Sequence, residues 1–209
     1  MALAGTNGSG KSSVAGAFLR AHGGTYFNPD ELARGLATSQ PSLAIREANS
    51  LAWHEGKQRL ETAIAAGDDF NFESTLGGQS ITRLLQHAID VGADVVVWYV
   101  ALASPELQLE RVRARVTEGG HDIPEAEIRK RYDTSRLNLI ELMPGLAELR
   151  VYDNSQHADL ANGEAPEPRL ILAMTKQKIV DHCDLVTAPV WAKPILAAAF
   201  AIDPAALRR

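Results

Sequence analysis

Apolar runs and alternating polar positions divide the chain into strands and helices. "ADVVVWYVALA", residues 93–103, is an almost continuous apolar run, as expected for a parallel strand buried on both faces. The first strand has few residues before a glycine-rich loop, so it is either unusually short or begins upstream of this numbering. Shorter strands are predicted at residues 1–5, 24–27, 69–75, 149–155 and 170–174.

Helical spacing of apolar residues fills most of the intervals between these strands. Ser104 is predicted to cap one helix, and the apolar tail at 195–202 is predicted to be a packed helix. Strands that alternate with helices predict an α/β fold, a three-layer, doubly wound, mostly parallel sheet in a single domain over residues 1–209. Helices are predicted at 11–22, 41–67, 79–92 and 104–120, from about 124, and near 136–143, with a helical turn or two at 30–36.

Composition narrows the class of protein. With 45% hydrophobic and 22% charged residues among 209, the chain has the composition of a soluble globular protein. Its formal charge of -5 argues against nucleic-acid binding by bulk electrostatics. Cys183 is the only cysteine, so no internal disulfide can form, which suits the cytoplasm. No leader peptide opens the chain and no apolar run approaches the ~20 residues that span a bilayer, so we expect no membrane contact.

The segment "GTNGSGKS", residues 5–12, has the full G-x-x-x-x-G-K-[ST] pattern of a phosphate-binding loop. Glycines let the backbone N–H groups surround phosphate oxygens, and the helix that follows directs its positive end at the anion. Lys11 is predicted to reach the β- and γ-phosphates of ATP, and the Ser12 hydroxyl to hold Mg²⁺. The predicted nucleotide-binding residues are Gly5, Thr6, Asn7, Gly8, Ser9, Gly10, Lys11, Ser12 and Ser13.

The string Leu76-Gly77-Gly78-Gln79 resembles the Leu-Ser-Gly-Gly-Gln signature of transporter ATPases. Such an ATPase also needs an apolar strand that ends in Asp-Glu downstream of the signature. The apolar strand here ends in Ala-Ser-Pro, and "TKQK" at 175–178 lacks the acid of the guanine-reading motif of GTPases. Both classes are therefore excluded, and residues 76–79 are interpreted as a turn between a strand and a helix.

A small kinase remains, and the chain contains the parts that it needs. Asp30 in "YFNPDELA" is placed to accept the proton of an acceptor hydroxyl, although it could also cap the helix that follows. Glu73, Ser74 and Thr75 end a strand at the carboxyl edge of the sheet. Acceptor hydroxyls or the magnesium shell would satisfy a carboxylate there, while Ser74 or Thr75 could instead cap the next helix.

A basic segment over about residues 111–136 is predicted to form a helical lid that closes over phosphates. The alternative is a solvated helix face, in which Glu125 and Arg129 form an ordinary pair one turn apart. Arg115, together with Arg129 or Arg131, is the best candidate for phosphate contact, and His121 could also donate. The basic residues are Arg111, Arg113, Arg115, Arg129, Lys130, Arg131 and Arg136.

These pieces together resemble the zeta-toxin-like kinases, in particular a stand-alone bacterial branch often described as predicted ABC-type ATPases. The resemblance rests on "AGTNGSGKSS", "FNPDELA", "NFESTL", "RVRARVTEGGHDIPEAEIRKRY", "VYDNS" and "APVWAKPIL", which run in this order from Ala4 to about Leu196. It implies a three-layer P-loop kinase core in which Asp30 is the base and Glu73 and Thr75 bind the acceptor. It also implies lid arginines at Arg115 and at Arg129 or Arg131. The toxin members phosphorylate a sugar hydroxyl of UDP-N-acetylglucosamine.

The sequence therefore predicts a monomeric, cytoplasmic kinase that moves the γ-phosphoryl of ATP to a hydroxyl of a small molecule, such as a UDP-activated amino sugar. Two alternatives stay open at this point. The acceptor could be a different small molecule, or the chain could be an ATP-binding regulatory protein with weak hydrolysis. The expected partners are ATP, Mg²⁺, the acceptor and, by the resemblance, an antitoxin protein.

Overall fold

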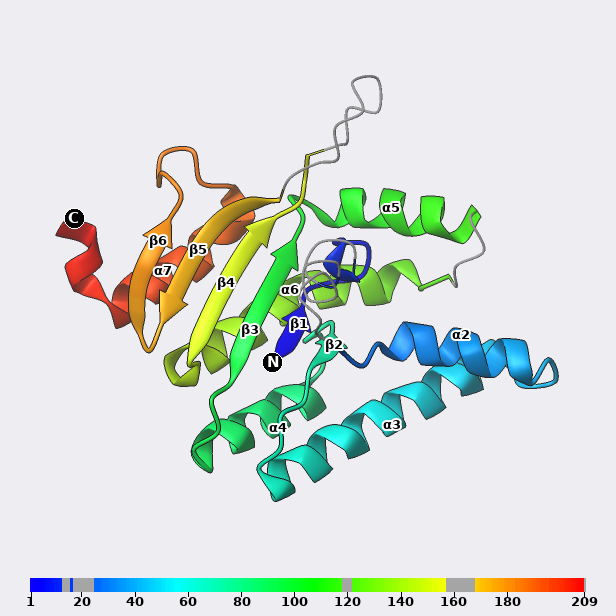
Figure 1. Ribbon diagram of the computed structural model, residues 1–209. Helices are drawn as coiled ribbons and strands as arrows, with labels where there is room; N and C mark the ends of the chain where they lie inside the picture. Colours follow the sequence, from blue (N-terminus) through cyan, green and yellow to red (C-terminus); the bar gives the residue numbers. More distant parts are fainter. Residues whose placement is uncertain (13–15, 17–24, 118–121, 157–167, 209) are drawn as a thin grey trace.

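A computed structural model of the protein describes residues 1–12, 16, 25–117, 122–156 and 168–208. Its sheet has six strands in the order β2-β1-β3-β4-β5-β6 (Figure 1). The four strands from β2 to β4 in this order are parallel, whereas β5 and β6 are antiparallel to their neighbours. The bounds are β1 Ala2–Ala4, β2 Phe72–Ser74, β3 Val96–Ala101, β4 Glu148–Asp153, β5 Arg169–Thr175 and β6 Lys178–His182.

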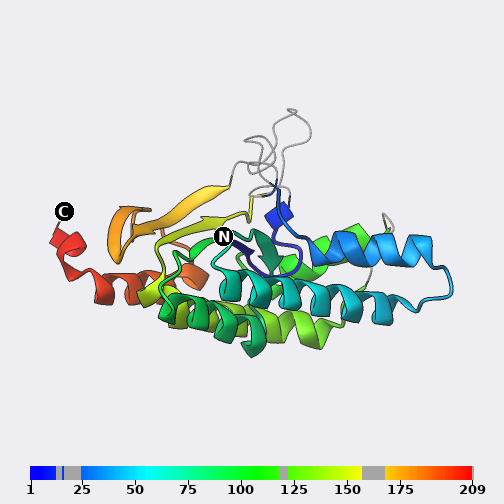
Figure 2. The ribbon, with the colours of Figure 1, turned by 60° about the horizontal axis from the view of Figure 1, so that its bottom comes forward.

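The helices confirm the α/β class that was predicted. Figures 1 and 2 together show α3, α4, α6 and α7 gathered along one face of the sheet. The helix predicted at 11–22 lies mostly outside the described residues. The bounds are α2 Pro29–Ser39, α3 Ile45–Ala66, α4 Gln79–Asp90, α5 Pro105–Thr117, α6 Glu125–Leu142 and α7 Lys193–Ile202, with 3-10 turns η1 Met143–Gly145, η2 Val190–Ala192 and η3 Pro204–Arg208.

The main hydrophobic core lies between the sheet and these helices. Central strands bury alternate side chains toward α6 and α7, as strand geometry requires, because successive residues point to opposite faces. The tail predicted to pack does so, since α7 buries Ile195, Leu196, Ala199 and Phe200. Fully buried members of this core are Val97, Tyr99, Leu149, Val151, Leu139, Leu142 and Ile195.

The structure corrects several predicted boundaries. The strand predicted at 24–27 is reduced to a single bridge between Phe27 and Phe72. The long helix predicted from Pro41 begins at Ile45, after a turn. The two helical pieces predicted after residue 124 are one continuous helix, α6.

The strand at 170–174 is not the last one, because β6 returns beside it through a tight hairpin. The two turn residues, Lys176 and Gln177, have φ of 44° and 65°. Two consecutive left-handed residues form a type I′ turn, which usually contains Asn and Gly. The sequence carried no such signal here, so β6 was missed.

Two pairs of helices project from the sheet on the same side of the molecule (Figures 1 and 2). The α2–α3 pair packs around Ala33, Ala48 and Ala52. The α5–α6 pair forms the predicted lid region, and its own small core contains Leu109, Val112, Ile123 and Ile128. None of the described helices is long and apolar enough to cross a membrane.

Candidate active site

The phosphate loop follows β1 at the carboxyl edge of the sheet, in the centre of the parallel strands. Gly5 has φ 135° and Gly8 has φ 77°, conformations that residues with a side chain rarely adopt. A Cβ atom on Gly5 would lie 2.0 Å from the Val100 carbonyl oxygen of β3. The loop therefore packs directly on the strand behind it, and only glycine fits there.

Two buried amide side chains hold the phosphate loop from behind. Gln108 of α5 donates through Nε2 to the Thr6 hydroxyl, and Asn154, just after β4, donates to the Ser9 carbonyl at 2.9 Å. Lys11 Nζ is 3.2 Å from the Thr6 carbonyl oxygen. The sequence analysis missed Gln108 and Asn154, because single amides in a helix and a strand end carry no motif. Ser13, also predicted to bind nucleotide, lies outside the described residues.

Glu73 lies against the phosphate loop. Its Oε1 is 3.4 Å from Lys11 Nζ, and its Oε2 accepts hydrogen bonds from Ser12 Oγ at 2.7 Å and from Asn28 Nδ2 at 3.2 Å. The sequence analysis proposed either the acceptor or the magnesium shell as its partner, and this geometry favours the phosphate and metal side of the site. A hydroxyl and a carboxylate oxygen side by side are ligands that Mg²⁺ accepts, so these residues fit that ion.

Asp30 lies at the other end of the same group of polar residues. It is not the cap of α2, because Asn28 accepts from the N–H groups of Asp30 and Glu31 at 2.9 and 3.3 Å. The Asp30 carboxylate instead faces Arg115 of α5, with 3.5 Å between Oδ2 and Nη1. Asp30 is therefore available for contact with a ligand in the pocket.

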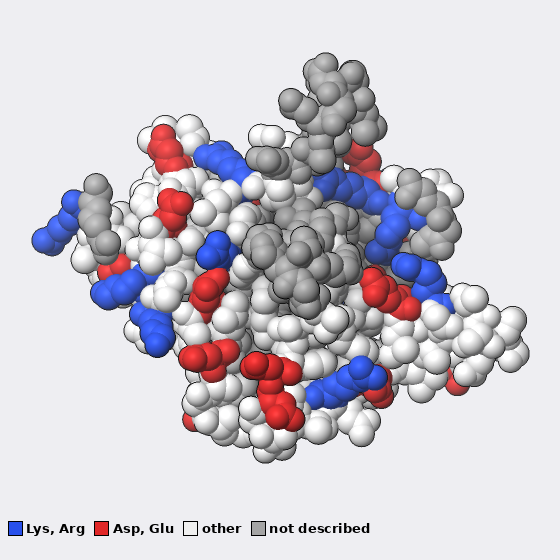
Figure 3. Space-filling model, viewed as in Figure 1, with Lys and Arg blue, Asp and Glu red and all other residues white. Residues whose placement is uncertain are grey.

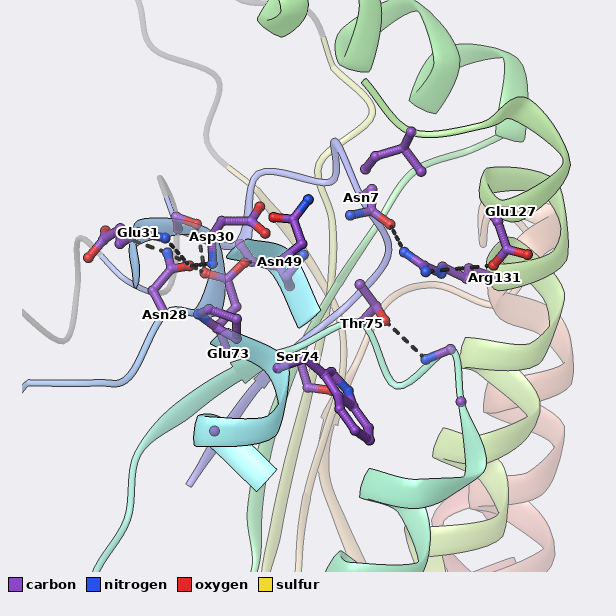
Figure 4. A pocket seen from close by; sticks show the side chains of 18 of the residues that line it. Asn7, Asn28, Asp30, Glu31, Asn49, Glu73, Ser74, Thr75, Glu127 and Arg131 are labelled. Carbon is purple, nitrogen blue, oxygen red and sulfur yellow. Dashed lines mark hydrogen bonds and ion pairs between the residues drawn. The ribbon is translucent and has the colours of Figure 1, made fainter. Parts of the chain in front are cut away.

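A cavity of about 1580 Å³ lies between the two helix pairs and opens onto the phosphate loop. Figure 4 shows Asn28, Asp30, Glu31 and Glu73 on one side of it and Asn7, Arg131 and Glu127 on the other.

The lining of this cavity is basic, although the chain has a net negative charge: eight Lys or Arg residues and five Asp or Glu residues line it. Figure 3 shows blue side chains gathered over α5 and the neighbouring lid region. The basic lining favours anionic ligands. The basic residues are Lys11, Arg34, Arg46, Lys57, Arg111, Arg115, Lys130 and Arg131.

The three arginines predicted to contact phosphate lie in different surroundings. Arg115 and Arg131 line the cavity, and Arg131 Nη1 donates to Asn7 Oδ1 of the phosphate loop at 3.1 Å. Arg129 is instead paired with Glu106 and Glu125, at 2.7 and 2.8 Å. The hydrogen bond from Arg129 lowers the pKa of Glu106. The solvated pair that was the alternative for Glu125 and Arg129 is thus present, and Arg131 is the better placed of the two candidates. His121 lies outside the described residues.

Arg111 also lines the cavity, at the base of the lid region. Its Nη2 donates to the Gln156 carbonyl at 3.1 Å, and burial lowers the pKa of its guanidinium. Arg111 is thus a basic residue of the site, whereas the sequence analysis counted it in the lid segment and predicted no phosphate contact for it.

The turn that resembles a transporter signature is held in place by α6. Ser135, Asn138 and Thr134 donate to three successive carbonyl oxygens, those of Thr75, Leu76 and Gly77, at 2.6, 2.6 and 3.0 Å. These contacts explain why polar residues interrupt the apolar pattern of this helix without breaking it.

Thr75 and the buried Tyr99 complete this turn. Thr75 Oγ1 accepts from the Gly77 N–H at 3.3 Å, and Tyr99 donates to Ser135 at 3.1 Å. Burial raises the pKa of Tyr99 to about 12. Thr75 therefore lines the cavity from a turn that hydrogen bonds from α6 hold in place.

This combination of loop, sheet and cavity defines a nucleotide-binding α/β protein of the P-loop class. The family model described as AAA domain, AAA_33, matches residues 1–135, and the chain belongs to that family. An uncharacterised protein of Haemophilus influenzae is 34% identical over 128 residues, which cover 61% of this chain and 88% of that protein.

Solved structures share the fold at low sequence identity. The AvrRxo1-ORF1:AvrRxo1-ORF2 structure with sulphate ions has a TM-score of 0.60 and 18% identity, with 95% of this chain aligned to 62% of that one. A candidate kinase from Chloroflexus aurantiacus has a TM-score of 0.52 and 15% identity, covering 74% and 87%. The PezAT toxin–antitoxin system of Streptococcus pneumoniae gives 0.53 and 15%, covering 79% and 72%. The chain spans less than two thirds of the AvrRxo1-ORF1 structure. The resemblance to zeta-toxin-like P-loop kinases is thus confirmed for the fold.

Proposed function

We propose that the protein transfers the γ-phosphoryl group of ATP to a hydroxyl of a small molecule. The observation that carries this proposal is one cavity that contains both a phosphate loop and, on a neighbouring helix, the carboxylate of Asp30 facing Arg115. An ATPase needs only a site for water beside the γ-phosphate. A cavity of about 1580 Å³ that extends between two helix pairs has room for a second substrate.

The polar residues around the phosphate loop supply the groups that this reaction needs. Lys11 and the loop N–H groups bind the β- and γ-phosphates, and Asp30 accepts the proton of the acceptor hydroxyl as the phosphoryl group leaves ATP. Arg115 and Arg131 stabilise the charge that develops on the transferred group. Ser12 and Glu73 would hold Mg²⁺, which supplies charge neutralisation on the phosphates when bound.

For the acceptor, we propose a UDP-activated amino sugar such as UDP-N-acetylglucosamine. The support is the wall formed by α2 and α3, which the sequence did not reveal. It presents Trp53, Asn49 and two guanidinium groups, Arg34 and Arg46, to the cavity. An indole ring can stack on a planar base, guanidinium groups pair with a diphosphate, and an amide can bond sugar hydroxyls.

The direct test is product analysis by mass spectrometry, with ATP, Mg²⁺ and either UDP-N-acetylglucosamine or a metabolite extract. We expect one added phosphate on the nucleotide sugar. Arg46→Ala and Trp53→Ala should raise the acceptor KM about 10-fold or more, as the loss of one anchoring contact does. Leu51→Ala is the matched control on the same helix, because Leu51 is exposed and does not line the cavity. A phosphorylated compound from the extract without a nucleotide would overturn the acceptor and keep the kinase. ATP hydrolysis without any new phosphorylated product would overturn the kinase.

The two toxin-related structures suggest partners and setting. AvrRxo1-ORF1 was solved with AvrRxo1-ORF2, and PezAT is a toxin–antitoxin system. We propose that this protein acts as a monomer in the cytoplasm, and that an antitoxin protein is one of its partners. Light scattering with and without ATP tests the monomer, and a dimer that forms only with ATP would contradict it.

A further inference from the structure

Asn28 lies between Glu73 and Asp30, two of the five acidic residues that line the cavity. It precedes Pro29 at the start of α2 and is buried, although an amide at this position could have been fully solvated. The sequence analysis assigned it no role, because the possible helix cap was given to Asp30. In Figure 4 it lies between Glu31, Asp30 and Glu73.

Both ends of the Asn28 amide are engaged. The oxygen accepts from the N–H groups of Asp30 and Glu31, at 2.9 and 3.3 Å. The nitrogen donates to Glu73 Oε2 at 3.2 Å and to Glu31 Oε1 at 3.5 Å. The orientation of the amide follows from chemistry, since backbone N–H groups require an acceptor and carboxylates require a donor.

We propose that Asn28 is a positioning residue that holds Glu73 and Asp30 in fixed relation to each other. Its oxygen starts α2 where Asp30 faces Arg115, and its nitrogen holds Glu73 against Lys11 and Ser12. This inference rests on the proposed function for its catalytic consequence, but the contact between residues 28 and 73 can be tested without it.

A helix cap alone would not need the amide nitrogen. Asp and Ser are N-caps about as good as Asn, so a residue that only caps could be replaced by either. The donor matters because Glu73 has one strong hydrogen bond from Ser12 and one cation, Lys11, at 3.4 Å. The Asn28→Asp substitution would place a third carboxylate beside those of Glu73 and Glu31, with Asp30 close by and paired to Arg115.

The first experiment measures urea unfolding at pH 7, without ATP or Mg²⁺, of Asn28→Asp, Asn28→Ser, Glu73→Gln and the Asn28→Asp/Glu73→Gln double variant. Asn28→Asp removes the nitrogen that donates to Glu73 Oε2 at 3.2 Å and puts an oxygen that cannot donate in its place, so the protein should be destabilised. This deficit should shrink in the Glu73→Gln background, because the side chain at position 73 then carries no charge and can itself donate. Asn28→Ser keeps a capping oxygen and adds no charge, so it should lose less stability than Asn28→Asp. A deficit that is the same in both backgrounds would overturn the contact.

The second experiment measures ATP turnover with UDP-N-acetylglucosamine, and ADP release without it. A misplaced catalytic group costs up to about 100-fold, so Asn28→Asp should lower kcat roughly 10- to 100-fold. The Mg²⁺ concentration that gives half-maximal turnover should also rise, because Glu73 is then no longer held against Ser12 and Lys11. Asn28→Ser should lower kcat, because it also removes the donor to Glu73. Its free energy of unfolding at neutral pH should fall by no more than the exchange of one N-cap residue for another costs. Wild-type kcat in Asn28→Asp would leave Asn28 as a cap and overturn the positioning role.

The two outcomes separate this inference from the proposed function. Absence of any phosphorylated product with the wild-type protein would overturn the kinase. The coupling between residues 28 and 73 would still be read from the unfolding data.

Discussion

The carboxylate of Asp30 and the guanidinium of Arg115 face each other across the cavity, 3.5 Å apart, from α2 and α5. Their side chains are 38% and 34% exposed, so the pair lies in contact with solvent. Exposed pairs of this kind contribute about 1 kcal/mol or less. In the proposed reaction, the acceptor and the γ-phosphate would therefore separate the two groups at little cost. Until then, the pair would hold Asp30, the proposed base, and Arg115 at the same point of the cavity.

Asp30→Asn tests the base. Asn keeps the shape of the side chain but cannot accept a proton, and α2 keeps its cap because Asn28 supplies it. We expect transfer to fall at least ~100-fold, the lower end of what a positioned base contributes, with ATP affinity near that of the wild type. Isothermal titration with ATP and a coupled ADP assay measure the two effects. If the transfer rate were unchanged, Asp30 would not be the base, and Glu73 would be the next candidate.

Lys11→Ala tests the phosphate loop. The substitution removes the cation that is proposed to bind the β- and γ-phosphates, and it leaves Glu73 without this partner. We expect ATP turnover to be lost, and the Tm increase that ATP and Mg²⁺ give the wild-type protein should disappear. Lys57→Ala is a control, since this cavity-lining lysine pairs with Glu61 away from the loop. Full turnover in Lys11→Ala would make the phosphate-loop assignment wrong.

Glu73→Gln and Thr75→Ala separate the metal side of the site from the acceptor side. Glu73 contacts Ser12 and Lys11, so its amide should weaken Mg²⁺-dependent ATP binding as well as transfer. Thr75 lines the cavity beyond the phosphate loop, so Thr75→Ala should raise the acceptor KM while ATP binding is unchanged. Titrating Mg²⁺ at fixed ATP distinguishes the two. If both substitutions raised only the acceptor KM and left Mg²⁺-dependent ATP binding unchanged, Glu73 would be an acceptor-binding residue and not a metal ligand.

The phosphate loop and the strand ends were predictable because each depends on local residues. Residues 5–12 include the glycines that the loop conformation needs, so the motif alone predicts the loop. The carboxyl ends of parallel strands meet at one edge of the sheet, so residues that end such strands are expected there. Glu73 could be placed at that edge from the pattern. Its contact with Ser12 could not, because it depends on the parallel pairing of β1 with β2, which brings distant segments together.

The parts that the sequence missed depend on contacts between distant segments. The sequence predicted two helical pieces after residue 124, whereas Thr134 and Ser135 hold the turn at 75–77 from within the single helix α6. The sequence between Asp30 and Glu73 carried no recognisable code for an acceptor, so Trp53 and Arg46 were assigned no role, whereas both line the cavity. Roles for Arg115 and Arg131 stay predictions, as does the lid.

Gln79→Ala tests whether residue 79 acts in catalysis or in folding. The sequence analysis interpreted Gln79 as part of a turn, but Gln79 Nε2 donates to Asn138 Oδ1 at 2.8 Å, and Asn138 is buried. Leaving this oxygen without a donor costs about 1–3 kcal/mol. We expect that loss in urea unfolding, with kcat close to the wild-type value. Gln86→Ala, on the same helix with only an exposed bond to Asp90, should cost less than about 0.5 kcal/mol.

Gly77→Ala decides between the kinase and the transporter interpretation of "LGGQ". A Cβ atom on Gly77 would lie 2.6 Å from Cγ of Arg131, so this arginine must move, and its 3.1 Å hydrogen bond to Asn7 should break. We expect kcat to fall roughly 10-fold, as for a displaced charge-stabilising group, with ATP affinity changed little.

Gly78→Ala is the matched control, because a Cβ atom there would meet nothing within 4 Å. In a transporter ATPase the signature acts on the nucleotide of a second subunit, so both glycines would matter and ATP would drive dimerisation. Steady-state kinetics and light scattering with ATP test the two interpretations together. If the control variant lost activity along with Gly77→Ala and the wild-type protein dimerised with ATP, the signature would be real. We expect only Gly77→Ala to be impaired, because the turn contacts Arg131 of its own chain.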